Sequence, residues 1–332
     1  MLPRLRAFHA AACLAAVGCS LEGLAGGGRP VDPVVPDAST SADGGLDLEA
    51  GTRCPGCEVI VQNEDRPTEL VRHGDRLFWI RAVPAGRVVA SDLDGRGVTT
   101  EADHVVSTPR DLVASAEAAF ALSEDGRLFR FLGRSTCEDA MGIRRLAAFG
   151  EELLFAKEVT LARGNCGTNT NIVSESVTAV VGDPPYAWYA RAGGDIVRCD
   201  ASAGQCSATR SVLATGQGDV TILAQDDTRV YWVATNGGRV EVRARRKGAI
   251  GAPDAPELLG TAMLPKTLLP AGDELYWTDL EQGVVVRAST LGATPPVTIA
   301  RGLDGPWGLA ATNDHVYVTE SRAGRIVRMP RR

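Results

Sequence analysis

The sequence predicts an all-β protein built as a single β-propeller of seven four-stranded blades, with six blades as the alternative. Three features indicate this fold: a period of about 40 residues, an aromatic pair in most units, and a glycine that opens the following hairpin. The clearest unit contains Pro265-Lys266-Thr267-Leu268, Tyr276-Trp277-Thr278-Asp279 and Gly283-Val284-Val285. Such a period of short strands is typical of propeller blades, since each sheet can bury its faces only against its neighbours.

The aromatic position marks the second strand of each expected blade. Successive positions are separated by 42, 34, 34, 43, 45 and 41 residues. We expect these side chains to pack between sheets, because aromatic side chains bury large apolar areas. The seven lines are Phe78-Trp79, Phe120, Leu154-Phe155, Trp188-Tyr189, Tyr231-Trp232, Tyr276-Trp277 and Tyr317.

Glycine and proline mark the ends of the expected strands. Glycine recurs at the turn after the aromatic strand, where a positive φ is expected. The third unit instead carries Gly164-Asn165-Cys166-Gly167-Thr168-Asn169, so an insertion in a six-bladed ring is the alternative. Proline suits the first residue of a strand, and it opens four of the expected innermost strands, at Pro67, Pro109, Pro265 and Pro306.

The last unit ends near Met329 after only three strands. A ring cannot close on an unpaired edge, because free backbone groups there invite pairing with other chains. We therefore expect residues 58–62 to supply the missing outer strand and to pair with the last blade.

The first 18 residues resemble a lipoprotein signal peptide. Arg4 and Arg6 precede an apolar stretch that is too short to span a bilayer. Ala16-Val17-Gly18-Cys19 resembles the bacterial lipobox, which implies lipidation of Cys19; a plain signal peptide is the alternative. Residues 19–53 are then expected to form a lipidated, disordered tether, and residues 54–332 the propeller. The signal peptide implies export. In lipoproteins an aspartate after the cysteine favours retention in the inner membrane; because Ser20 stands there instead, we expect lipid anchoring to the bacterial outer membrane.

Six of the eight cysteines lie beyond Cys19, which suits disulfides in an exported chain. Six cysteines allow 15 pairings, so the sequence alone cannot choose among them. Nearness favours the bridges Cys54–Cys57, Cys137–Cys166 and Cys199–Cys206. A structural bridge in Cys54-Pro55-Gly56-Cys57 is favoured over a redox site, because no βαβ pattern surrounds it.

The formal net charge of −6 and the scattered arginines argue against a nucleic-acid partner. We expect a monomer whose partner, an unidentified protein or small ligand, binds the loop face of the ring. The membrane is contacted through the lipid anchor.

The motif Tyr276-Trp277-Thr278-Asp279 resembles the YWTD propellers, and residues 305–320 are similar to an NHL-type blade. The resemblance implies a six-bladed ring for the YWTD type and a binding function more often than catalysis. Gluconolactonase-like and virginiamycin-lyase-like propellers are enzymes that use a metal in the central channel, which makes a metal-dependent lactonase or lyase the alternative function.

No catalytic motif or cofactor is expected, and the leading function is a non-enzymatic binding or scaffolding module. Turn residues that would converge on a channel metal, if they are not simply turn formers, are Glu124, Asn236, Asp279 and Glu320. Candidate ligand contacts on the loop face are Trp307, Arg81, Arg110, Arg191 and Arg322.

Overall fold

A computed structural model gives the fold of residues 54–83, 86–102, 109–115, 118–131, 135–137, 142–165, 168–204, 206–253, 255–291 and 294–331. The expected signal peptide, the lipidation site Cys19 and the tether lie outside the described residues. No helix in the described ranges is long and apolar enough to cross a membrane.

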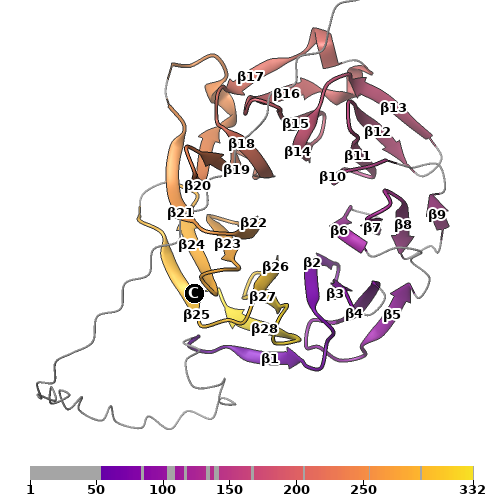
Figure 1. Cartoon of the computed structure of the whole chain (residues 1–332), viewed down its shortest axis with the longest axis vertical. Coiled ribbons are helices and arrows are strands. Elements are labelled where there is room, and N and C mark those ends of the chain that lie inside the picture. Colours follow the sequence, from indigo (N-terminus) through magenta and orange to yellow (C-terminus); the bar gives the residue numbers. More distant parts are fainter. Residues whose placement is uncertain are drawn as a thin grey trace, which may run out of the picture. The chain divides into compact units, whose positions relative to one another are not determined.

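The described strands form seven four-stranded antiparallel sheets, the blades of one β-propeller (Figure 1). Blade 1 contains β2 (Pro67–His73), β3 (Arg76–Arg81), β4 (Arg87–Asp92) and β5 (Thr99–Ala102). Blade 2 contains β6 (Pro109–Ala114), β7 (Ala119–Ser123), β8 (Leu128–Phe131) and β9 (Ser135–Cys137). Blade 3 contains β10 (Arg145–Phe149), β11 (Glu152–Ala156), β12 (Leu161–Asn165) and β13 (Thr168–Val173).

The remaining blades repeat this order along the chain. Blade 4 contains β14 (Val177–Asp183), β15 (Tyr186–Arg191), β16 (Ile196–Asp200) and β17 (Ser211–Ala214). Blade 5 contains β18 (Asp219–Gln225), β19 (Arg229–Asn236), β20 (Arg239–Arg246) and β21 (Glu257–Ala262). Blade 6 contains β22 (Pro265–Ala271), β23 (Glu274–Asp279), β24 (Val284–Ser289) and β25 (Val297–Arg301). Blade 7 contains β26 (Pro306–Ala311), β27 (His315–Glu320), β28 (Arg325–Pro330) and the N-terminal strand β1 (Glu58–Val61).

The pairing of β1 with β28 confirms the expected closure of the ring. The two strands are antiparallel, with Glu58 opposite Arg328 and Val59 opposite Val327. The third unit is a regular four-stranded blade rather than an insertion, so the propeller has seven blades and the six-bladed alternative is wrong.

Hydrophobic side chains fill each junction between neighbouring blades. Phe78 packs with blade 2, whereas Trp79, the next residue of β3, packs with blade 7. Tyr276 and Trp277 divide in the same way between blades 7 and 5. Successive side chains of a strand point to opposite faces of its sheet, so each aromatic pair serves two junctions. This confirms the prediction that the aromatic side chains of the second strands pack between the sheets.

Two glycines at the turn between the second and third strands show why that position excludes a side chain. Gly194 has a φ of 81°, and a Cβ there would lie 2.2 Å from the carbonyl oxygen of Gly218. Gly324 has a φ of 66°, and its Cβ would lie 2.5 Å from the carbonyl oxygen of Glu64. In both cases the atom approached belongs to the loop that leads into the next blade. Glycine therefore supplies both the positive φ and the close approach.

Two of the expected disulfides are present. Cys54 and Cys57 are bridged just before β1, and Cys199 and Cys206 are bridged at the end of β16. The second bridge spans the short 3-10 helix η1 (Ala201–Ala203) and reaches η2 (Cys206–Ala208). Another short 3-10 helix, η3 (Lys247–Ala249), follows β20. Cys166 lies outside the described residues, so the Cys137–Cys166 bridge stays a prediction.

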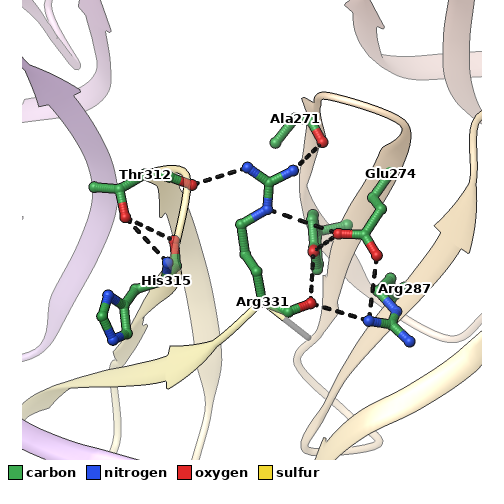
Figure 2. Close-up of polar contacts among 7 residues, drawn as sticks. Ala271, Glu274, Arg287, Thr312, His315 and Arg331 are labelled. Atoms are coloured by element: carbon green, nitrogen blue, oxygen red, sulfur yellow. Dashed lines mark hydrogen bonds and ion pairs between the residues drawn. The ribbon is translucent and has the colours of Figure 1, made fainter.

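Arg331 ties the end of the chain to blades 6 and 7 (Figure 2). Its guanidinium donates to the backbone carbonyls of Thr312 (2.9 Å) and Ala271 (2.5 Å), and its Nε lies 3.7 Å from a carboxylate oxygen of Glu274. Arg287 in turn donates to the backbone carbonyl of Arg331 at 2.9 Å. Ala271 is the last residue of β22, and Thr312 directly follows β26. Because these are the inner strands of blades 6 and 7, the side chain of Arg331 connects the two blades.

We expect Arg331→Ala to lower the melting temperature by about 5 °C, because hydrogen bonds from a charged group contribute about 1.5–3 kcal/mol and each kcal/mol shifts a domain of this size by about 2–4 °C. Circular dichroism during heating measures the change. Arg301→Ala, which alters an exposed arginine on β25, is the control and should leave the melting temperature within about 1 °C of wild type. Equal melting temperatures for both variants would contradict the proposed role of Arg331.

Candidate binding site

The seven inner strands lie around the centre of the ring (Figure 1). A cavity of about 550 Å³ lies among them. Residues from β2, β6, β10, β14, β18 and β22 line this cavity. Its volume lies in the range of about 300–1,000 Å³ that is usual for small-molecule sites. Strands β14 and β18 contribute apolar side chains and one threonine, whereas β2, β6, β10 and β22 each contribute charged side chains. The apolar side contains Ala179, Val180, Thr221 and Ile222.

The charged side carries two acids and three bases, one or two on each strand. We use the term channel site for these five residues together with Trp307, which contacts two of them: Glu69, Arg110, Asp111, Arg145, Lys266 and Trp307. Within the described part of the chain, none of the five charged groups forms an ion pair within 4.0 Å. A lining that keeps unpaired charges around a cavity is characteristic of a binding site rather than of a structural core.

Trp307 links Glu69 to Lys266 at the meeting point of β22, β26 and β2. Its indole Nε1 donates to Oε1 of Glu69 at 3.0 Å, and the ammonium of Lys266 lies 4.4 Å from the centre of its ring. Burial and the nearby carboxylate of Asp111 raise the pKa of Glu69 to about 7, against the smaller opposing effects of the Trp307 hydrogen bond, Lys266 and Arg145. Glu69 therefore changes its charge near neutral pH.

Asp111, Arg110 and Arg145 occupy the neighbouring strands β6 and β10. Asp111 accepts a hydrogen bond from the backbone N–H of Leu146 at 3.2 Å, and burial raises the pKa of its carboxyl group. Arg110 donates to the backbone carbonyl of Ile143, while its Nε is buried without a hydrogen-bond partner in the described structure. Burial, and then the positive charge of Arg145, lower the pKa of Arg110.

Threonine hydroxyls hold the inner strands that carry Trp307 and Glu69. Thr278 of β23 and Thr267 of β22 both donate to the backbone carbonyl of Trp307, at 2.7 and 3.0 Å. Thr319 of β27 donates to the backbone carbonyl of Thr68 at 2.7 Å, one residue before Glu69. Each bond runs from one blade to the inner strand of the next, or between neighbouring inner strands. The threonine of the Tyr276-Trp277-Thr278-Asp279 motif thus helps to position the site.

Asp279 and Glu320, two of the predicted metal ligands, brace the loops that lead into the inner strands. The carboxylate of Asp279 accepts from the backbone N–H groups of Met263 (2.7 Å) and Leu264 (3.2 Å), just before the strand with Lys266. Glu320 accepts from the backbone N–H of Asp304 at 2.7 Å and pairs with Arg325. Both carboxylates are buried and their oxygens are engaged, so the turn-forming alternative accounts for them.

The other two predicted metal ligands lie apart from the cavity. Glu124 is exposed and lines a neighbouring pocket of about 440 Å³, which shares Arg110 with the channel site. Asn236 is exposed and is the last residue of β19. Among the described residues no group of three or more His, Cys, Asp or Glu side chains is arranged to hold a metal ion. A metal site formed by these four residues stays a prediction that no contact supports.

Of the predicted ligand contacts, Trp307 and Arg110 reach the channel site. Arg81 is paired with the buried carboxylate of Glu64, at 2.6 Å. Arg191 is paired with Asp195 at 2.5 Å. Arg322 is about half exposed and lies 4.0 Å from Glu281, so it remains a surface residue of the loop face.

Four members of the channel site are missing from the sequence prediction, although a signal exists for three of them. Each inner strand that opens with proline carries a channel residue one or two positions later, as in Pro67-Thr68-Glu69 and Pro265-Lys266. The proline fixes the start of the strand, so the residues directly after it mark the channel end. Arg145, which opens β10 without a proline, has no such signal. The residues missed are Glu69, Asp111, Arg145 and Lys266.

No family model and no curated protein matches the chain. Solved structures match it in fold, with propellers of widely different sequence. The chain is similar to streptogramin B lyase, with a TM-score of 0.62 and 10% identity over 84% of this chain and 97% of that one. The Cps50 (Swd1) propeller of Myceliophteria thermophila gives a TM-score of 0.62 and 12% identity over 82% and 98%. BamB from Moraxella catarrhalis gives a TM-score of 0.54 and 14% identity over 86% of this chain and 93% of that one.

Identities this low show the β-propeller fold alone. The YWTD or NHL type stays a prediction that rests on the sequence motifs, because no family model matches. Function must therefore be argued from the channel site itself.

We expect Glu69→Gln to raise the melting temperature near pH 8 and to leave it unchanged near pH 4.5. The pKa of Glu69 is about 7 in the folded protein, above its ordinary value of 4.5, so the folded state holds the proton more tightly than the unfolded chain. Glu69 therefore destabilises the fold progressively as pH rises from about 4.5 to 7, and glutamine, which cannot ionise, removes this effect.

Thermal unfolding of wild type and variant at both pH values measures the difference. Asp273→Asn, which changes an exposed carboxylate in the turn after β22, is the control and should shift the melting temperature equally at both pH values. A Glu69→Gln effect that does not depend on pH would contradict the prediction.

Proposed function

We propose that this protein is an exported, lipid-anchored binding protein of the bacterial outer membrane whose propeller binds a small ligand at the channel site without transforming it. One observation supports the site above all: five charged side chains line one cavity, the indole of Trp307 contacts two of them, and none of the charges is neutralised by an ion pair among the described residues. Four of the five charged groups are partly shielded from solvent and Arg145 is exposed, and a ligand that pairs with these charges explains why they converge on one cavity without ion-pair partners.

The anchor is proposed from the sequence. The lipobox-like Ala16-Val17-Gly18-Cys19 would place two or more acyl chains at the N-terminus, which is enough for durable attachment. The disulfides Cys54–Cys57 and Cys199–Cys206 suit an oxidising compartment outside the cytoplasm.

A metal-dependent propeller enzyme is the alternative, and one structural neighbour is by name a lyase. The observation that bears on this alternative is the engagement of Asp279 and Glu320 with backbone N–H groups of the loops. The carboxylates of both residues already accept hydrogen bonds from the protein, so binding at the channel site is the better supported function.

We expect the purified full-length protein to retain a low-molecular-mass compound from a bacterial metabolite extract. Protein and extract are mixed, separated by gel filtration and analysed by mass spectrometry after denaturation. Trp307→Ala and Arg145→Gln should each reduce the retained amount at least tenfold, because each removes a side chain of the channel site. Arg322→Ala, on the exposed loop face, is the control and should retain as much as wild type.

Retention that is equal in all four proteins, or absent from all of them, would contradict a channel binding site. Melting temperatures measured with millimolar Ca²⁺, Mg²⁺ or Mn²⁺ test the alternative in the same preparations. A rise with one of these ions would favour the metal-dependent enzyme.

We expect Cys19→Ala to move the protein from the membrane fraction to the soluble fraction, because it removes the sulfur that would carry the acyl chains. Cell fractionation followed by immunoblotting measures the distribution. Cys13→Ala, within the expected signal peptide, is the matched control and should remain in the membrane fraction. A Cys19→Ala variant that stays with the membranes would contradict the anchor.

A further inference from the structure

The channel site contains two positive side chains on neighbouring strands. Arg110 of β6 and Arg145 of β10 both line the cavity, and the positive charge of Arg145 adds to burial in lowering the pKa of Arg110. The only side-chain hydrogen bond of Arg110 goes to a neutral carbonyl, that of Ile143, and its Nε has no partner in the described structure. An anionic group between the two guanidinium groups would remove their repulsion and supply hydrogen-bond acceptors.

Two negative side chains lie beside this pair. Glu69 of β2 and Asp111 of β6 repel each other, which contributes to the raised pKa of Glu69. In the described structure their hydrogen-bond donors are uncharged: the indole of Trp307 for Glu69 and backbone N–H groups for Asp111, whose carboxylate Arg145 and Arg110 also stabilise at longer range. Lys266 and Arg145 act on Glu69 only at longer range, without an ion pair. A cationic group between the two carboxylates would remove their repulsion as well.

The opposite side of the cavity is small and apolar. Ala179 and Val180 of β14 and Ile222 of β18 line it, together with the hydroxyl-bearing Thr221 of β18. The whole space of about 550 Å³ is enough for a molecule of dipeptide size, but not for a folded partner.

A ligand with one charge would satisfy only one of the two pairs. A simple anion would meet Arg110 and Arg145 but would face the carboxylates of Glu69 and Asp111, and a simple cation would meet the reverse problem. A ligand that carries both charges relieves both repulsions and leaves the net charge of the site unchanged.

Building on the proposed channel function, we infer that the ligand is a small zwitterion of the amino-acid or short-peptide class. Its carboxylate would lie at Arg110 and Arg145, its ammonium group at Glu69 and Asp111, and a small apolar side chain against Ala179, Val180 and Ile222. Trp307 and Lys266 would form the wall beside the ammonium end.

The test uses three probes that differ by one charge each, measured by isothermal titration calorimetry with the full-length protein. Alanylalanine carries both charges, N-acetyl-alanylalanine lacks the ammonium group, and alanylalaninamide lacks the carboxylate. Alanylalanine is expected to bind, and each capped probe to bind at least tenfold more weakly, because a charge-assisted hydrogen bond contributes about 1.5–3 kcal/mol.

Two variants assign the ends of the ligand. Arg145→Gln should weaken alanylalanine at least tenfold and leave alanylalaninamide unchanged, since that probe has no carboxylate to lose. Asp111→Asn should weaken alanylalanine and leave N-acetyl-alanylalanine unchanged. Arg301→Gln on the outer strand β25 is the matched control and should change none of the three affinities.

Each other outcome overturns the inference in a different way. Equal binding of N-acetyl-alanylalanine would show an anion site, and equal binding of alanylalaninamide a cation site; both would leave the proposed channel function intact. If no probe binds at millimolar concentration although the metabolite experiment shows retention that depends on Trp307, the ligand class is wrong and the channel function stands. Failure of the metabolite experiment is the separate result that removes the channel function.

Discussion

The propeller depends on one constraint: no blade can bury its faces alone. Seven apolar clusters lie between neighbouring sheets, and each draws side chains from both. The last junction forms only because β1 pairs with β28 and supplies Val61 to the cluster between blades 7 and 1. An open ring would expose that cluster and leave a free strand edge, so the closure by the N-terminal strand stabilises every other junction.

The same closure creates the channel site. Glu69 follows β1 by only a few residues, whereas Trp307 lies 238 positions further along the chain, and the closed ring brings them within 3.0 Å. Thr319 bonds to Thr68 across the junction between the last and first blades, close to both. The Glu69–Trp307 contact therefore lies where the ring is joined, while the other residues of the site come from blades 2, 3 and 6, so the geometry of the site depends on the seven blades being complete.

Much of the fold can be predicted from the sequence, because strand alternation and turn formation depend on residues that are close together in the chain. The aromatic pairs alternate between two junctions, as any two successive residues of a strand must, and the turn glycines have positive φ for local steric reasons. The site is less readable. Trp307 is predicted from its place at the entry to an inner strand and Arg110 as a residue of the loop face. Arg81 is predicted in the same way as Arg110, but it pairs with the buried carboxylate of Glu64, which the sequence does not reveal. Asp279 resembles a metal ligand until its oxygens are seen to accept backbone N–H groups.

The sequence by itself determined the repeat, the blade boundaries and the need for a closing strand, because turn chemistry and strand alternation act over a few residues. The tertiary structure alone decided the blade number, since only the pairing of β10 to β13 shows that the third unit is a complete blade. It also decided which charges meet in the channel. Glu69, Asp111, Arg145 and Lys266 come from four different blades, and their unpaired state is a property of the distances between strands, which no local pattern encodes.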